Sequence, residues 1–505
     1  MTVLLRHPAL VVHAFLPAAR VLGPTDSPAR RALDDIWARM RAAGYRDRMG
    51  SWPTELVLPA ADDGQDTLTV LGAAAKPTVD GSRELLVYRV RGVIGVSTVD
   101  ATRRERTSWA DFDHGWLAEL GHLDRTDLID TVLVHSGLSP RRSVRSRPSE
   151  PPAESCRRLA GGPPDLGPGG PPRSCWHPTE GMTVWELPRD PGTPASRRLL
   201  AVAGADDEQI LDEWLWTSSS PGLPPFTRYL IQAGKLRYHR AVLRRDLPRL
   251  RGTVQDVGRL CDRLDAMLHG ADVPLERILE ANRKLADLGT RQKGLIEQLS
   301  DVRAMTGTVE IIRRNLDAIV DQVSPTDHET ADWTLDQLRA EERYLSAAQL
   351  KAAELGRLAT STVSTRLEER KANLTLFQTV ALGSVLMALA AIQSLGYKVP
   401  LTGRLQAPTI FLLAAVALTL PWAVVRWLRG APYHRRWAVV DVAFAALMGA
   451  AAAWFARSFI VWWCTAFRFR WDWSVAVTVG AATAGAAVGA GIALLRLRQL
   501  RKSST

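Results

Sequence analysis

The side chains of this sequence that could bind a metal ion or activate a reactant are few and scattered. Cys156, Cys175 and His177 combine thiols with an imidazole, which is a donor set that zinc accepts. They lie in a Pro-rich stretch, and none of them belongs to a CxxC pair. Because structural zinc sites usually carry such paired spacing, we expect no metal site here.

A second group, Asp111, Asp113 and His114, falls together in ADFDHGW and could transfer protons. No candidate nucleophile accompanies it in a recognisable setting. The sequence also has no Walker-type phosphate loop, no GxSxG and no HExxH. We therefore expect a non-enzymatic protein without catalytic residues and without a cofactor.

The C-terminal quarter of the chain is apolar enough to enter a lipid bilayer. Its first apolar stretch carries no charge and is long enough to cross a hydrocarbon core of about 30 Å. Arg and Lys residues are enriched on one side of the proposed spans, which favours cytoplasmic N- and C-termini. We expect a multi-pass protein of the cell (inner or plasma) membrane with a C-terminal four-helix transmembrane bundle. This transmembrane domain comprises 373–505, with spans at about 374–396, 408–425, 437–456 and 474–495.

Two features inside the proposed spans could have a function. Asp441 is the only acid within a span; it could reach the interface, pair with Arg435 or Arg436, or serve conduction. Small residues recur at a spacing of four, which lets helix backbones approach closely. They could serve packing within one subunit or assembly of subunits around a pore, and we expect a homo-oligomer. The candidate helix-packing residues are Gly449, Ala481, Gly485 and Gly489.

Residues 1–222 show the mixed pattern of an α+β domain, which we place in the cytoplasm. Ser27 and Pro28 are typical of the start of a helix. The run 83–99 predicts two strands joined near Gly92.

Residues 137–180 interrupt this domain. They are rich in Pro, Gly, Ser and Arg, a composition that cannot bury a core, and we expect a disordered insertion. Strand-like runs follow at 183–187 and 198–203. These runs would complete the sheet of the first domain.

Residues 223–372 predict a long α-helical, coiled-coil-like stalk. Pro248, Pro274 and the turn at 324–327 are expected to divide it. A second long helix, 332–371, would run straight into the first membrane span. An apolar residue recurs every seventh position, as in a coiled-coil or long-bundle seam. The seam consists of Leu288, Leu295, Val302, Val309, Leu316 and Val323.

The densest cluster of aromatic and basic side chains falls where the first domain meets the stalk. We interpret it as the junction between the two, and a partner-binding surface is the alternative. The cluster consists of Trp214, Trp216, Phe226, Arg228, Tyr229, Lys235, Arg237 and Tyr238, with Pro224 and Pro225 between its members.

The net charge of +11 does not by itself indicate a nucleic-acid partner. Much of it is Arg beside apolar segments, where positive charge first of all sets membrane topology. No recognised nucleic-acid-binding motif accompanies the charge, so we expect the bilayer, and no nucleic acid, as a partner.

The opening LVVHAFLP with its following Trp37 helix, the block LPPFTRYLIQAGKLRYHRAVL and the segment LFQTVALGSVLMALAAIQSLGYKVPL extend over both ends of the chain. In these features the chain resembles the caspase-and-TPR-repeat-associated (CATRA) proteins of actinobacterial conflict systems. The resemblance implies caspase-like peptidases and TPR proteins as neighbours and possible partners. It also implies a non-enzymatic membrane component of a defence or cell-death pathway, and it transfers no site residues.

Two functions follow as hypotheses. The first is a membrane-anchored sensor or adaptor, whose cytoplasmic domain binds a partner and whose stalk couples it to the transmembrane bundle. The alternative is a pore-forming effector or ion channel gated by the cytoplasmic domain. Cation channels of the CorA type share the order of domains, but they have two spans and a Gly-Met-Asn motif that is not found at the end of the first span here.

Overall fold

The computed structural model divides into two compact units, Met1–Ala359 and Thr360–Thr505, which are described separately. The expected acid–histidine group at 111–114 lies outside the described residues. The structure describes 5–24, 26–59, 67–79, 81–102, 112, 128–147, 149–161, 170–188, 196–216, 222–270, 273–398, 403–429, 435–466, 483–484 and 487.

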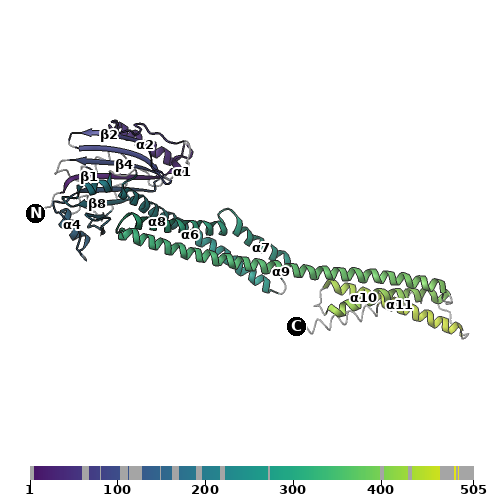
Figure 1. Ribbon diagram of the computed structural model, residues 1–505. Helices are drawn as coiled ribbons and strands as arrows, with labels where there is room; N and C mark the ends of the chain where they lie inside the picture. Colours follow the sequence, from purple (N-terminus) through teal and green to yellow (C-terminus); the bar gives the residue numbers. More distant parts are fainter. Residues whose placement is uncertain are drawn as a thin grey trace. The chain divides into compact units, whose positions relative to one another are not determined.

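The first unit contains an eight-stranded sheet with the order β2-β3-β4-β1-β5-β8-β7-β6 (Figure 1). Neighbouring strands are antiparallel except β5 and β8, which are parallel. Strands from both sides of the Pro-rich stretch belong to this one sheet, as the sequence predicts. The strands are β1 (Arg6–Pro17), β2 (Thr69–Thr78), β3 (Gly81–Val90), β4 (Val93–Thr102), β5 (Asp130–Leu138), β6 (Ser174–Trp176), β7 (Met182–Leu187) and β8 (Arg197–Ala203).

The join between β3 and β4 is a two-residue hairpin turn at the predicted place. Val90 pairs with Val93, and the two residues between them have positive φ, 45° at Arg91 and 73° at Gly92. Positive φ at both positions is the geometry whose twist matches that of the flanking strands.

One face of the sheet is covered by α1 (Ala18–Val21), α2 (Pro28–Ala42) and α4 (Pro152–Ala160). Helix α2 begins as predicted, because the Ser27 side chain accepts a hydrogen bond from the Arg30 amide at 3.1 Å. Its residues Leu33, Ile36, Trp37 and Met40 join the core cluster formed with alternate residues of β1.

Helix α4 corrects the expectation that 137–180 is disordered. Pro152 stands in its first turn, where a missing amide hydrogen costs nothing. Its apolar side packs Cys156 and Leu159 into a core with Trp185 of β7. A short amphipathic helix can therefore form inside a Pro-rich composition when the sheet offers an apolar surface to cover.

The opposite face of the sheet receives α5 (Glu208–Leu215) and α6 (Pro225–His269), which contact β8 and β5 respectively. Buried polar side chains lie on this face. His13 stacks on Phe15 at a centroid distance of 5.8 Å, and its Nδ1 lies 2.8 Å from the Ser97 hydroxyl. Burial lowers the pKa of His13 to about 3, so this imidazole is neutral in the folded protein.

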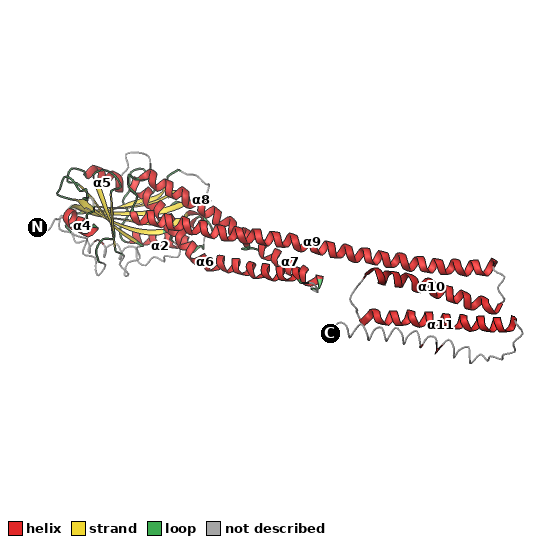
Figure 2. Cartoon of the chain, turned by 90° about the horizontal axis from the view of Figure 1, so that it is seen from below, coloured by secondary structure: helices red, strands yellow, loops and turns green. Residues whose placement is uncertain are grey.

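The helical part of the first unit is built from α6, α7 (Leu275–Thr290), α8 (Leu295–Ile319) and the start of α9 (Pro325–Lys398), which run together in Figure 2. Ion pairs between α8 and α9, such as Arg303–Glu342 at 2.8 Å and Arg313–Asp332 at 2.7 Å, show that these two helices are antiparallel. Of the predicted seam, Leu295, Val302, Val309 and Leu316 are buried.

The expectation that Pro248 divides the helical region is wrong, because it lies inside the continuous helix α6. Proline removes one helical hydrogen bond, and tertiary packing can outweigh that loss. Leu243 and Leu250 are buried on either side of it, and Arg251 pairs with Glu341 of α9 at 3.2 Å.

The second unit contains the end of α9 together with α10 (Gly403–Arg429) and α11 (Arg435–Ala466). Helices α10 and α11 lie side by side, with the Phe411 and Trp454 ring centroids 5.5 Å apart. Among the described residues one stretch is long and apolar enough to cross a membrane, Asp441–Trp463, with a mean hydropathy of 1.6 and 6% of its apolar 18-residue window buried.

This stretch differs from the predicted third span, 437–456, because it extends to Trp463. A shorter apolar helix, Leu405–Thr419, overlaps the predicted second span. The fourth span lies outside the described residues apart from 483, 484 and 487. The structure thus has an N-terminal sheet domain and a long helical C-terminal part, and the four-helix transmembrane bundle stays a prediction.

Candidate functional site

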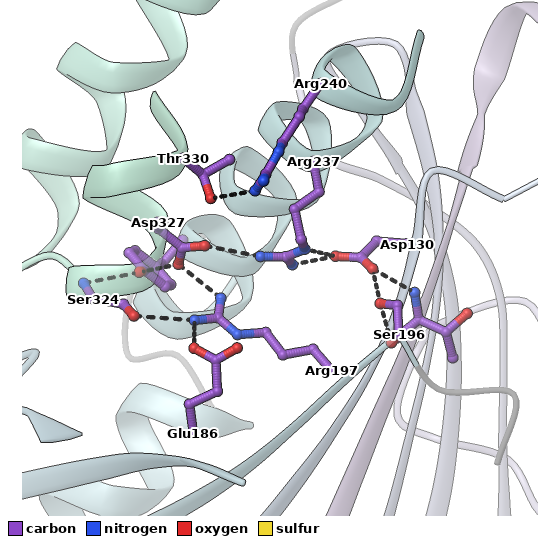
Figure 3. Close-up of polar contacts among 11 residues, drawn as sticks. Asp130, Glu186, Ser196, Arg197, Arg237, Arg240, Ser324, Asp327 and Thr330 are labelled. Carbon is purple, nitrogen blue, oxygen red and sulfur yellow. Dashed lines mark hydrogen bonds and ion pairs between the residues drawn. The ribbon is translucent and has the colours of Figure 1, made fainter. Parts of the chain in front are cut away.

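A chain of five alternating charges joins the sheet to the helices inside the first unit (Figure 3). Arg197 of β8 pairs with Glu186 of β7 at 2.9 Å and with Asp327 of α9 at 2.7 Å. Arg237 of α6 pairs with Asp327 at 2.9 Å and also with Asp130 of β5. We call Glu186, Arg197, Asp327, Arg237 and Asp130 the ion chain; it ties three strands to two helices.

Asp327 is the centre of the ion chain, and 1% of its surface is exposed. Burial alone would raise the pKa of this carboxyl, but Arg197 and Arg237 hold it below its usual range. The Tyr229 hydroxyl donates a further hydrogen bond to Oδ2 at 2.5 Å. Asp327 also stands in the first turn of α9, where the helix dipole favours a negative charge.

Arg197 is buried, and both terminal nitrogens of its guanidinium are paired. Burial opposes the charged form, yet Asp327 and Glu186 place the pKa of its guanidinium well above the ordinary value. One nitrogen also donates to the Ser324 hydroxyl at 3.2 Å. The guanidinium carbon lies 5.6 Å from the centre of the Trp176 ring, which adds a cation–π contact.

Asp130 anchors the ion chain at the first residue of β5. Its carboxylate accepts hydrogen bonds from Arg237, from the Ser196 hydroxyl and from the Thr131 amide, the last at 3.0 Å. Helix α6 reaches it closely because residue 234 is glycine: a Cβ there would lie 2.9 Å from the Cβ of Asp130. Gly234 therefore sets how near α6 can approach the strand.

A second contact links the β6–β7 turn to the connection between α8 and α9. The His177 amide donates to the Gln322 side chain at 3.0 Å, and the Asp321 amide donates to the Pro178 carbonyl at 2.9 Å. The Thr183 hydroxyl donates to the Val144 carbonyl, so it can only accept from His177 Nδ1. The imidazole is thereby fixed as the Nδ1–H tautomer, and burial lowers its pKa.

The ion chain is suited to holding elements together rather than to chemistry on a substrate. It contains three carboxylates and two guanidiniums, each guanidinium placed between two of the carboxylates. Removing one partner of a buried pair costs about 3–5 kcal/mol, because the other charge stays buried without compensation. The sheet and the helices are therefore expected to separate at this junction only when the whole first unit unfolds.

The structure separates the predicted aromatic and basic cluster into two groups. Phe226, Tyr229 and Arg237 lie at the sheet–helix junction, with the Phe226 and Tyr229 rings stacked at 5.8 Å. Trp216 and Arg228 line a groove beside the outer strands.

The remaining members of the cluster lie near these groups. Lys235 donates to the Arg91 carbonyl at 2.9 Å, on the rim of the same groove. Trp214 is half-buried on α5, and Tyr238 is half-buried with its ring edge-on to His239.

Sequence reasoning missed four members of the ion chain: Asp130, Glu186, Arg197 and Asp327. A usable signal was the placement of charges in otherwise apolar strands, as in RRLLAVA, which begins with Arg197. A charge at a buried strand position requires a partner.

The other predicted positions are the candidate metal ligands and the residues inside the proposed spans. Within the described residues no group of three or more His, Cys, Asp or Glu could hold a metal ion. Cys156 is buried, which raises the pKa of its thiol to about 12 and makes it a poor metal ligand. Asp441 and Gly449 lie half-buried on α11, whereas Ala481, Gly485 and Gly489 lie outside the described residues.

Fold and site together define two domains within the first unit, a sheet domain and a helical domain, which buried charges join. Two family models match these parts: the CASPASE and TPR Repeat-Associated N-terminal domain over residues 9–219 and the corresponding C-terminal domain over residues 224–352. The chain belongs to this caspase- and TPR-repeat-associated family. Asp130, Glu186 and Arg197 lie in the first match, and Arg237 and Asp327 lie in the second, so the ion chain joins the two family domains.

Other comparisons add little. No curated protein matches the chain. Among solved structures, the CorA magnesium transporter from Methanocaldococcus jannaschii aligns with 62% of this chain and 94% of its own, at 12% identity and a TM-score of 0.28. A TM-score of that size does not establish a common fold.

Proposed function

We propose that the chain is a membrane-anchored, non-enzymatic sensor or adaptor of a bacterial conflict system that contains caspase-like peptidases and TPR proteins. The family name records an association with both kinds of protein. The proposal that a signal passes from the sheet domain to the membrane region rests on the ion chain, because it fixes the start of α9 to the sheet. A partner that shifts the strands of the sheet would therefore also shift the start of this helix.

Helix α9 is the element that would carry the signal. It begins at the ion chain and continues without interruption to Lys398, into the apolar part of the chain. Helices α6 and α9 are parallel and linked at intervals, for example by Arg240–Thr330 and by Lys351–Asp262 at 2.7 Å. Paired helices of this kind move together rather than bend independently.

Membrane anchoring rests on the second unit. The apolar stretch of α11 has 23 residues, which at 1.5 Å per residue gives about 34 Å and exceeds a core of about 30 Å. Leu382 and Leu386 of α9 are 67% and 59% exposed, which suits contact with lipid. The proposal keeps the four predicted spans, cytoplasmic termini and a homo-oligomeric assembly.

The test uses the full chain co-expressed with caspase-like and TPR proteins of its own host. The proposal predicts co-purification from detergent-solubilised membranes and retention of the chain in membranes after an alkaline carbonate wash. A chain that washes off the membrane, or that binds neither protein, would overturn it.

The pore-forming alternative makes a different prediction. Reconstituted full chain would release dye from loaded liposomes, and release would depend on residues 374–495. The adaptor proposal predicts no release with or without the partners. Leakage in either condition would therefore contradict a function as adaptor alone.

A further inference from the structure

A groove on the outer strands β2 and β3 lies apart from the ion chain and is lined by apolar and basic side chains. Helix α6 packs on β5 and β1, and no described helix covers the corresponding face of β2 and β3. Leu86 of β3 is only half-buried there, whereas its neighbours Leu85 and Val87 on the other face have no exposed surface. Apolar side chains that stay partly exposed together in one groove, rather than singly, are typical of a binding site.

The walls of this groove come from three other parts of the first unit. Trp52 lines it and is 42% exposed, and Ile231 of α6 and Ile319 at the end of α8 also line it. The cavity has a volume of about 1060 Å³. Pockets for single small molecules measure about 300–1,000 Å³, so this one is large enough for a peptide segment.

The charges at the groove select the occupant. Arg91 and Arg228 line it and are both exposed. The carboxylate among the lining residues, Glu84, accepts a hydrogen bond from Trp216 Nε1 at 2.6 Å, which holds it against the wall. Two guanidiniums against one engaged carboxylate attract a ligand that carries acidic groups.

We propose that this groove binds an acidic, apolar peptide segment of a partner protein, with apolar side chains on Leu86 and Trp52 and carboxylates at Arg91 and Arg228. The inference rests on the proposed adaptor function, for which it names the docking site and the chemistry of the partner.

The position of the groove also explains how binding reaches the ion chain. Arg228 and Ile231 face the groove, while Tyr229 of the same helix donates to Asp327. A peptide bound at Arg228 therefore contacts the residue next to Tyr229, which is hydrogen-bonded to the centre of the ion chain. Ile319, in the same wall, is the last residue of α8 before the turn into α9.

The test is a display screen of a random dodecapeptide library on the full chain in lipid nanodiscs. Enriched peptides are expected to combine Asp or Glu with large apolar residues. Arg228→Glu and Trp52→Ala, both at positions with exposed side chains, should each weaken binding of these peptides at least tenfold. The matched control Arg277→Glu, an exposed arginine of α7 outside the groove, should leave binding unchanged.

Three results would overturn the inference: no enriched peptide, enrichment of basic peptides, or enriched peptides that bind both groove variants as tightly as the unmodified chain. These results leave the adaptor function standing if the chain still co-purifies with the caspase-like or TPR protein. Peptide binding without any such co-purification would instead support the groove and overturn the adaptor function.

Discussion

Arg237 of α6 and Asp327 of α9 lie ninety positions apart in the sequence and 2.9 Å apart in the structure. The same separation of 90 recurs between Arg251 and Glu341, farther along the same two helices. Two parallel helices in constant register, joined to three strands by the ion chain with Asp327 at its centre, form a stiff connection. A substitution at Asp327 is therefore expected to disturb both helices and the sheet.

Asp327→Asn is expected to destabilise the first unit by about 3–5 kcal/mol. The substitution removes the charge between Arg197 and Arg237, and the Arg197 side chain is 2% exposed. Urea-dependent pulse proteolysis of the full chain in detergent measures the loss. Because the folded-state pKa of Asp327 is lowered, its contribution is complete above the unfolded value near 3.9 and disappears as pH falls through the lower folded value.

A surface ion pair is the matched control for this substitution. Glu310 pairs with Arg339 at 2.8 Å, but the two side chains are 45% and 52% exposed. Glu310→Gln should therefore cost less than about 1 kcal/mol. Equal losses for the two variants would contradict the central place given to the ion chain.

His13 predicts a separate dependence of stability on pH. The unfolded chain binds a proton at this imidazole near pH 6.5, and the folded chain does so near pH 3. The unfolded state thus holds more protons between these values, and stability falls with pH from about 6.5 downward. The slope from this one group is at most about 1.4 kcal/mol per pH unit.

His13→Gln should flatten that slope, as measured by the free energy of unfolding between pH 7.5 and 5. His7→Gln is the control, because its side chain is 52% exposed and pairs with Glu208. An unchanged slope in the His13 variant would show that the imidazole is accessible to protons in the folded state.

The parts of the fold that could be predicted rest on local signals. Ser27 before Pro28 begins a helix by direct capping, and Gly92 marks a hairpin because few residues adopt its φ. The periodic apolar residues of α8 predict its buried side, since helical geometry alone brings them together.

The parts that could not be predicted depend on distant partners. Asp130 lies 107 positions from Arg237, and no local pattern connects the two. Helix α4 forms in a composition that is typical of disorder, because the sheet supplies its apolar partner. Pro248 is retained within α6 for a related reason: the neighbouring helices stabilise the residues on both sides of it.

Two glycine substitutions should change stability in opposite directions. A Cβ at Gly92 or at Gly258 meets no atom within 4 Å, so only the backbone conformation decides the effect. Gly92 has a φ of 73°, and Gly92→Ala should cost about 1–2 kcal/mol. Gly258 lies in α6, and Gly258→Ala should gain about 1 kcal/mol; chemical unfolding measures both, and a shift of the same sign would contradict the hairpin or the helix assignment.

The apolar stretch of α11 can be tested by placing a charge at its centre. Ala452 is exposed near the middle of Asp441–Trp463, where it would face lipid in a membrane. A lysine there costs about 2.5–3.5 kcal/mol on insertion scales, so Ala452→Lys should shift the insertion equilibrium of this segment in microsomes by roughly a hundredfold. Ala452→Leu is the matched control, because it adds volume and apolar surface without charge and should insert at least as well. If the lysine variant inserts as readily as the leucine variant, this helix does not cross the bilayer centre, and the anchoring role would have to fall on α9 or α10.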